Sequence, residues 1–98
     1  MAEQKLRFSH LGTPVVLELI EARDPSLCRF GYKVGDTWEV NIWESSDLCG
    51  LAYHAFFADI AMFQSGGEAF YKPTEKDRLV RSCPDVRTGY RFLIRKKT

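Results

Sequence analysis

One stretch of this chain constrains its fold more than any other, because it has the pattern of a helix that is apolar on most sides. Ser45, Ser46 and Asp47 precede positions 48–64 and can accept hydrogen bonds from the free N–H groups of a first helical turn. Gly66-Gly67 follows and supplies the left-handed stop that ends many helices. The sequence therefore predicts one long helix over 48–64. Its large apolar side chains are Leu48, Leu51, Tyr53, Phe56, Phe57, Ile60, Met62 and Phe63.

Such a helix must be covered on most sides, and a chain of 98 residues builds only one modest core. Two arrangements would cover it: a sheet that wraps around it, or a second copy of the chain on its outer face. We expect residues 1–98 to form a single domain and to assemble as a homodimer through helix 48–64. A monomer with a highly curved sheet is the alternative.

Short β-branched and alternating segments predict the sheet. We expect strands at 15–20, 38–42, 79–83 and 90–95, with a fifth strand at 6–9. Asp24-Pro25 and Gly35-Asp36 predict turns between the first two of these strands. The expected fold class is α+β, with a mostly antiparallel, partly rolled sheet packed around one long apolar helix.

The formal net charge of +1 conceals an uneven distribution. Positions 1–85 carry 9 basic and 13 acidic side chains, whereas positions 86–98 carry five basic residues and no acidic one. Arginines alternate with apolar residues in 90–95, which is typical of a half-buried strand and argues against nucleic-acid binding. No apolar run approaches the ~20 residues of a membrane span. The first residues lack the apolar core of a secretory signal, so we expect a cytoplasmic protein that contacts no membrane.

Three cysteines, Cys28, Cys49 and Cys83, are the first candidates for chemistry. Their odd number argues against a disulfide framework, and no Cys-x-x-Cys pair provides the spacing of a structural zinc site. Each lies beside a turn or cap, and Cys49 falls in the predicted first helical turn, where exposed N–H groups favour a thiolate. The cysteines are therefore either small buried hydrophobic residues or members of a shared metal or thiol site.

Other residues give weaker signals. Asp59 is a carboxylate in an apolar stretch, and we expect an arginine partner or a place on the solvent-facing stripe of the helix. His54 follows Cys49 by five residues, so the two do not share a helix face as a metal-binding pair would. Neither a Gly-x-Ser-x-Gly nucleophile motif nor a phosphate-binding glycine loop occurs. The aromatic residues that are candidates for lining an apolar ligand pocket are Trp38, Trp43, Tyr53, Phe70 and Tyr71.

The motifs together resemble a family of small uncharacterised prokaryotic proteins. That family has a Cys-x-x-Gly-His-x-x-Gly-Asp segment, a Leu-Cys-x-x-Ala helix start, a Gly-Gly and a Cys-Pro-Asp near the C-terminus. The matching segments of this chain begin at Cys28, Leu48, Gly66 and Cys83, and Tyr32 stands where the pattern commonly has histidine. The resemblance implies that the three cysteines belong to a family pattern, and it supplies no activity.

Two functions compete at this point. In the first, Cys28, Cys49, Cys83 and Asp85 form a site that binds zinc or iron or presents a reactive thiol. The metal version leaves a fourth position for His54, Asp85, water or substrate, and the thiol version makes Cys49 the nucleophile, with Asp85 or Lys33 tuning its environment. In the second, the chain is a noncatalytic dimeric interaction module or small-ligand-binding module whose cysteines are structural.

Overall fold

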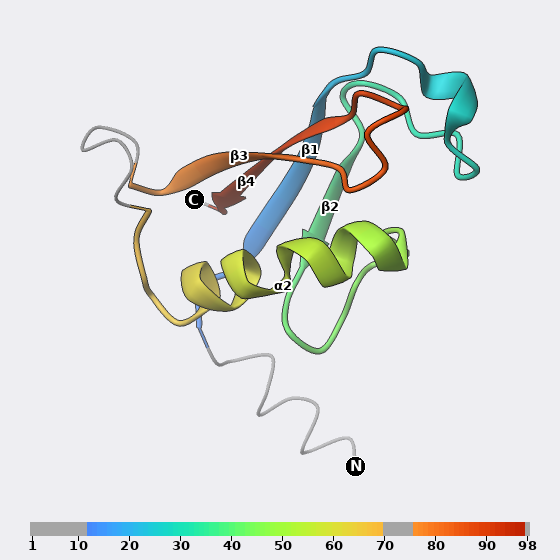
Figure 1. Cartoon of the computed structure of the whole chain (residues 1–98). Coiled ribbons are helices and arrows are strands. Elements are labelled where there is room, and N and C mark those ends of the chain that lie inside the picture. Colours follow the sequence, from blue (N-terminus) through green and yellow to red (C-terminus); the bar gives the residue numbers. More distant parts are fainter. Residues whose placement is uncertain (1–11, 70–75, 98) are drawn as a thin grey trace.

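The computed structural model describes residues 12–69 and 76–97 and shows four strands and one α-helix. In chain order the elements are β1 (Val15–Glu21), the 3₁₀ turn η1 (Pro25–Leu27), β2 (Thr37–Val40), α2 (Gly50–Gln64), β3 (Arg78–Ser82) and β4 (Arg91–Lys96). All neighbouring strands are antiparallel, in the order β2-β1-β4-β3, and α2 lies against one face of this sheet (Figure 1). The α+β class and the four strands are therefore confirmed, whereas the expected strand at 6–9 lies outside the described residues.

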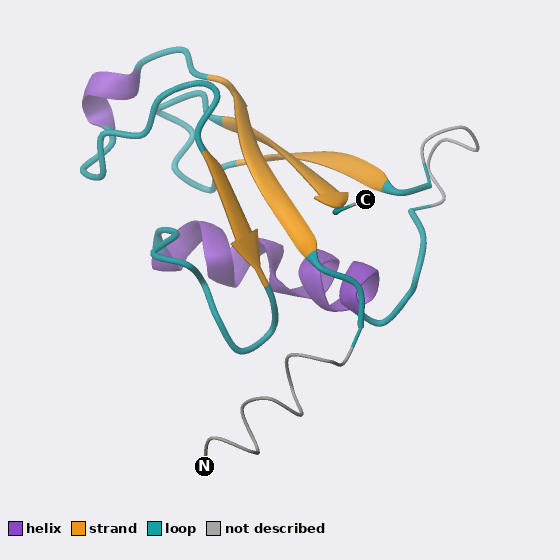
Figure 2. Cartoon of the chain, turned by 180° about the vertical axis from the view of Figure 1, so that it is seen from behind, coloured by secondary structure: helices purple, strands orange, loops and turns teal. Residues whose placement is uncertain are grey.

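The core lies between α2 and one face of the sheet. Leu17 pairs with Trp38 on β2 and with Ile94 on β4, so these side chains share a face, and Leu17 and Ile94 are fully buried there. The helix contributes one buried stripe to the same core, formed by Ala52, Phe56, Ile60 and Phe63. Figure 2 shows α2 beneath one side of the sheet, with the opposite side uncovered by any helix of the described chain.

The observed helix is shorter than the predicted helix 48–64, and it is buried along one stripe instead of on most sides. The helix begins at Gly50 and has 15 residues, and its N-cap residue, Cys49, makes no side-chain cap hydrogen bond. The predicted capping residues do not cap α2: Ser46 and Asp47 adopt positive φ angles of 54° and 65°, in a turn that ends two residues before the N-cap Cys49. At the other end the stop is confirmed: Gly66 has φ +88°, and Gly67 N–H donates to Met62 O at 2.8 Å.

The expected rolled sheet is not confirmed either. The strands of the described chain have 4 to 7 residues, and α2 buries one stripe of side chains against one face of the sheet. Asp59 lies at the edge of that stripe and accepts two hydrogen bonds from Arg81 on β3, at 2.9 and 3.1 Å. The expected arginine partner of Asp59 is therefore confirmed, and this ion pair ties α2 to an edge strand.

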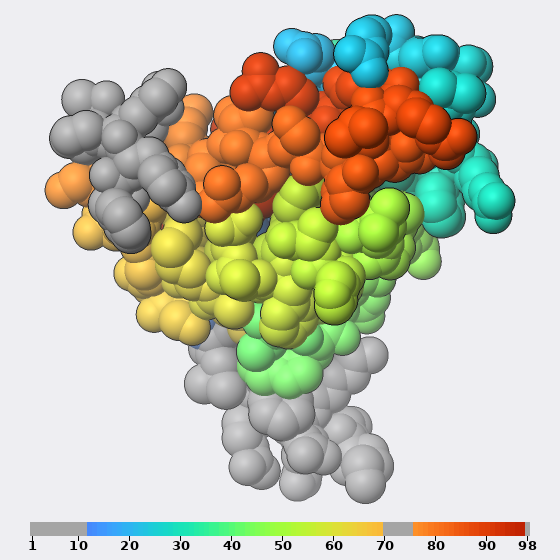
Figure 3. All heavy atoms as spheres, in the orientation of Figure 1, coloured from blue at the N-terminus to red at the C-terminus, as the bar shows by residue number. Residues whose placement is uncertain are grey.

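Three loops meet at one end of the molecule, and Figure 3 shows them side by side: the segment after η1, the start of α2 and the β3–β4 loop. The β3–β4 loop is fastened to the end of β1, because Thr88 O accepts from the backbone N–H groups of Arg23 and Asp24 at 3.0 and 2.8 Å. The turn after η1 is bonded to β1 as well, because Gly35 N–H donates to Leu19 O at 2.9 Å.

A search of the described residues for membrane-spanning helices finds none with the necessary length and hydropathy.

Candidate functional site

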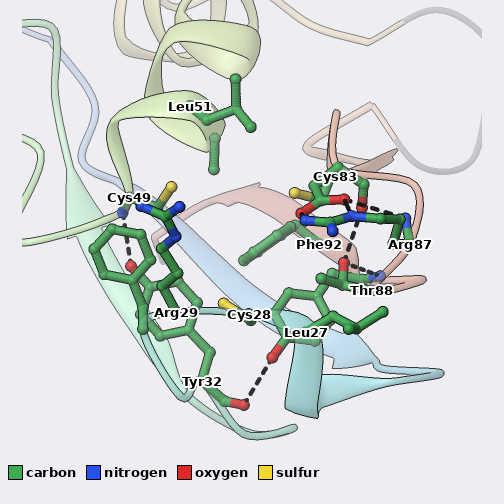
Figure 4. Close-up of a pocket in the computed structure, with 14 residues that line it drawn as sticks. Leu27, Cys28, Arg29, Tyr32, Cys49, Leu51, Cys83, Arg87, Thr88 and Phe92 are labelled. Carbon is green, nitrogen blue, oxygen red and sulfur yellow. Dashed lines mark hydrogen bonds and ion pairs between the residues drawn. The ribbon is translucent and has the colours of Figure 1, made fainter.

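A pocket of about 300 Å³ opens where these three loops meet. One wall comes from the chain around η1, a second from the first turn of α2, and a third from the β3–β4 loop, with Phe92 of β4 at the base (Figure 4). The volume is at the lower end of the ~300–1,000 Å³ that small-molecule sites occupy. The pocket is therefore large enough for a small organic ligand.

All three cysteines line this pocket, although they are 21 and 34 positions apart in the sequence. Cys28 follows η1, Cys49 is the N-cap of α2, and Cys83 follows β3. The three are free thiols and half-buried, and Figure 4 shows their sulfur atoms turned toward the same hollow. The structure thus places these residues, together with Asp85, on the walls of one pocket.

One expectation for these cysteines is a metal site. Among residues 12–69 and 76–97, no three or more His, Cys, Asp or Glu side chains are arranged so that they could hold a metal ion. His54 is exposed on α2 and does not line the pocket. A zinc or iron site built from Cys28, Cys49 and Cys83 therefore has no support in this geometry.

Burial changes the chemistry of Cys83. It raises the pKa of this thiol, and the Asp85 carboxylate acts in the same direction, against a hydrogen bond from the Asp85 backbone that lowers the pKa. Cys83 is consequently a protonated thiol at neutral pH and a poor nucleophile. Of the two proposed tuning residues, Asp85 lies on the pocket wall, whereas Lys33 does not and instead donates its backbone N–H to Asp36 at 2.9 Å.

Two tyrosines connect the pocket walls. The Tyr32 hydroxyl accepts a hydrogen bond from the backbone N–H of Cys49 at 2.7 Å, so it takes the place of the missing N-cap side chain of α2. The hydroxyl of Tyr90 donates to Tyr32 O at 3.1 Å. Burial, followed by a hydrogen bond with Cys28, raises the pKa of Tyr90 to about 12. Both phenols are therefore neutral structural groups of the pocket wall.

The rim carries three charged side chains, and two of them form a pair. Asp85 accepts from Nε and Nη2 of Arg87 at 2.9 and 3.0 Å, and these bonds hold the pKa of Asp85 below its usual range. The third is Arg29, which Figure 4 shows reaching across the hollow in the direction of Cys49. No carboxylate of the described chain lies within ion-pair distance of Arg29.

The remaining wall is mostly apolar, but not with the aromatic residues that the sequence suggested. Trp38 packs in the core between Tyr32 and Phe92, at ring distances of 4.7 and 5.8 Å. Trp43 and Tyr53 do not line the pocket, and Phe70 and Tyr71 lie outside the described residues. The aromatic lining is instead Phe30, Tyr32, Tyr90 and Phe92.

Sequence reasoning missed Arg29, Tyr32 and Tyr90 as pocket residues. A signal existed for the first two, because both lie within four positions of Cys28, on the segment already singled out for its turn chemistry. No such signal marked Tyr90, because Tyr90 and Phe92 are separated by Arg91 in the alternating pattern of an ordinary strand. Its position became visible only through the register of β3 and β4, where Cys83 N–H bonds to Tyr90 O at 2.9 Å.

No family model matches this chain, and neither a curated protein nor a solved structure is significantly similar to it. The resemblance to the cysteine-motif family stays a prediction.

Proposed function

We propose that this protein binds a small, largely apolar molecule in the three-thiol pocket, with the cysteines serving as part of the wall. The pocket itself carries the proposal: it is about 300 Å³ in volume, and thiols, aromatic rings and aliphatic side chains from three separate loops converge on it. The raised pKa of Cys83 supports a binding role over a nucleophilic one for that thiol. Three free cysteines also favour a cytoplasmic location, because free thiols persist in a reducing compartment.

The rim supports the same proposal. Leu27, Phe30 and Leu51 line the pocket with exposed fractions of 41%, 56% and 50%. Large apolar side chains are rarely left in water as a group unless they contact a partner or a ligand. These three would close over the apolar body of a bound molecule, and removing that surface from water would supply most of the binding free energy.

The test uses N-phenyl-1-naphthylamine, an uncharged dye whose fluorescence rises in an apolar site. Leu51→Trp puts a larger side chain at the mouth of the pocket, and we expect it to weaken dye binding at least ~tenfold, or ~1.4 kcal/mol. Val80→Trp is the control, because Val80 is 38% exposed on β3, away from α2 and outside the pocket lining. Equal dye affinity in wild type and Leu51→Trp, with both chains folded by circular dichroism, would refute the proposal.

A second measurement uses the thiols as reporters. Bound dye should slow the alkylation of all three cysteines by N-ethylmaleimide, because each thiol faces the occupied space. Peptide mass mapping over time gives the rate at each cysteine. Unchanged alkylation at saturating dye would place the dye elsewhere on the protein.

We also propose that the outer face of α2 forms a homodimer interface, as the apolar pattern of 48–64 indicated. The exposed Phe57 and a stripe of small residues, Ala55 and Ala58, on the solvent side of the helix support this. Sedimentation analysis should show a dimer for the wild type and a monomer for Ala58→Arg. A wild-type chain that stays monomeric at high protein concentration would contradict the proposed interface.

A further inference from the structure

We propose that the ligand of this pocket is an amphipathic anion, a molecule with one carboxylate or similar acidic group on an aromatic or aliphatic body. This inference rests on the proposed function and adds the ligand's chemical class. It follows from the contrast between an apolar cavity and the charged groups at its mouth.

The first step concerns the balance of charge at the rim. Asp85 and Arg87 neutralise each other through two hydrogen bonds of 2.9 and 3.0 Å. Arg29 remains as a guanidinium on the pocket wall, and no carboxylate of the described residues lies within ion-pair distance of it. Among the described residues that line the pocket, one positive charge therefore has no paired carboxylate. A planar guanidinium binds a carboxylate through two parallel hydrogen bonds.

The second step concerns the start of α2, which forms part of the same wall. Cys49, Leu51 and Ala52 line the pocket, so the positive end of the helix dipole lies beside it. The Tyr32 hydroxyl accepts from the backbone N–H of Cys49, the side chain of Cys49 itself makes no cap hydrogen bond, and the first turn has no acidic residue. A ligand anion between Arg29 and this helix end would meet positive potential from two sides. Figure 4 shows Arg29 reaching across the hollow toward that end.

The third step concerns the rest of the ligand. The base of the pocket is Phe92, which is 1% exposed, and the side is formed by the ring of Phe30, stacked on Tyr32 at 5.5 Å. These surfaces offer nothing to a strongly hydrated ion such as phosphate. They suit a flat or flexible apolar body that lies against the rings while its acidic end stays at the rim.

The experiment compares two dyes that differ by one acidic group: neutral N-phenyl-1-naphthylamine and its sulfonate, 1-anilinonaphthalene-8-sulfonate. We expect the wild-type chain to bind the sulfonate about fivefold more tightly than the neutral dye at low salt. The preference should decline as sodium chloride is added, because the guanidinium is exposed to solvent. In Arg29→Gln the preference should disappear, so that the two dyes bind with similar affinity.

Arg91→Gln is the matched control. It removes one exposed arginine from β4, outside the pocket lining, and should leave the dye preference unchanged. Benzoate and benzamide provide a second pair, followed by amide chemical shifts of residues around Arg29, and benzoate should be the tighter ligand. Failure of both dyes to bind would refute the ligand-binding function itself. Binding of the neutral dye with no preference for the sulfonate, or a preference that survives Arg29→Gln, would overturn only the anion inference.

Discussion

Tyr32→Phe tests whether a side chain from the loop after η1 caps the helix. The substitution removes one oxygen and leaves the ring stacks with Phe30 and Trp38 in place. The backbone N–H of Cys49 then loses its 2.7 Å partner at a half-buried position. Loss of a helix cap costs ~0.5–2 kcal/mol, and an unsatisfied partly buried donor costs ~1–3 kcal/mol. We therefore expect Tyr32→Phe to lower the free energy of unfolding by about 1–2 kcal/mol.

Urea denaturation measures this loss, and in a domain of this size each kcal/mol lowers the melting temperature by ~4–8 °C. Amide hydrogen exchange by NMR shows where in the chain stability is lost. Protection against exchange should fall selectively at Cys49 and in the first turn of α2. Tyr53→Phe is the control: it removes a tyrosine hydroxyl that donates to Asn41 O at 2.6 Å, away from the cap. A stability loss below ~0.3 kcal/mol, with Cys49 exchange unchanged, would show that the Tyr32 hydroxyl does not cap the helix.

Three further outcomes follow from the structure. Asp59→Asn removes a bidentate bond to Arg81 whose side chains are 16% and 37% exposed, and solvent screening limits the expected loss to about 1 kcal/mol in urea denaturation. Gly89→Ala should lower the free energy of unfolding by ~2 kcal/mol, because Gly89 has φ +65° and an added Cβ would overlap the side chain of Arg23. A thermal melt equal to that of wild type would contradict this. Stability should also fall in alkaline solution: the raised folded-state pKa values of Cys83 and Tyr90 mean that their contribution is complete below about pH 9 and is lost as pH rises toward 12. The rise in the pKa of Tyr90 from 10.0 to about 12 corresponds to ~2–3 kcal/mol of unfolding free energy. A free energy of unfolding that stays constant over this pH range would refute the burial of the phenol.

The strands and the helix stop were predictable because their signals are local. The apolar, β-branched run at 15–20, the alternation in 38–42 and the two glycines at 66–67 determine backbone geometry within a few residues. The helix start was not predictable in this way, since Ser46 and Asp47 look like capping residues but take positive φ angles in a turn. The actual cap comes from Tyr32, 17 positions upstream of Cys49, and no local rule identifies a partner at that separation.

The order of the motifs suggested that the three cysteines lie close together, but only the strand register explains why they do. Antiparallel pairing of β3 with β4 and of β4 with β1 brings Cys83 and Thr88 to the end of β1, from which the chain continues to Cys28. The metal hypothesis required more than proximity. Zinc bonds to sulfur are ~2.3 Å long, so ligating thiolates must converge on one point, whereas these thiols stand on separate walls of a cavity about 300 Å³ in volume.

Tyr32 belongs both to the cap of α2 and to the pocket lining, so it should couple ligand binding to the stability of the helix start. The Tyr32 hydroxyl caps α2 through Cys49, while its ring forms part of the pocket lining. Any ligand held between Arg29 and the helix start therefore stabilises the same first turn that Tyr32 stabilises. The two effects should be coupled. In Tyr32→Phe the frayed turn must be ordered again before the ligand binds, so affinity for the anionic dye should fall together with stability, whereas Tyr53→Phe should lower stability alone.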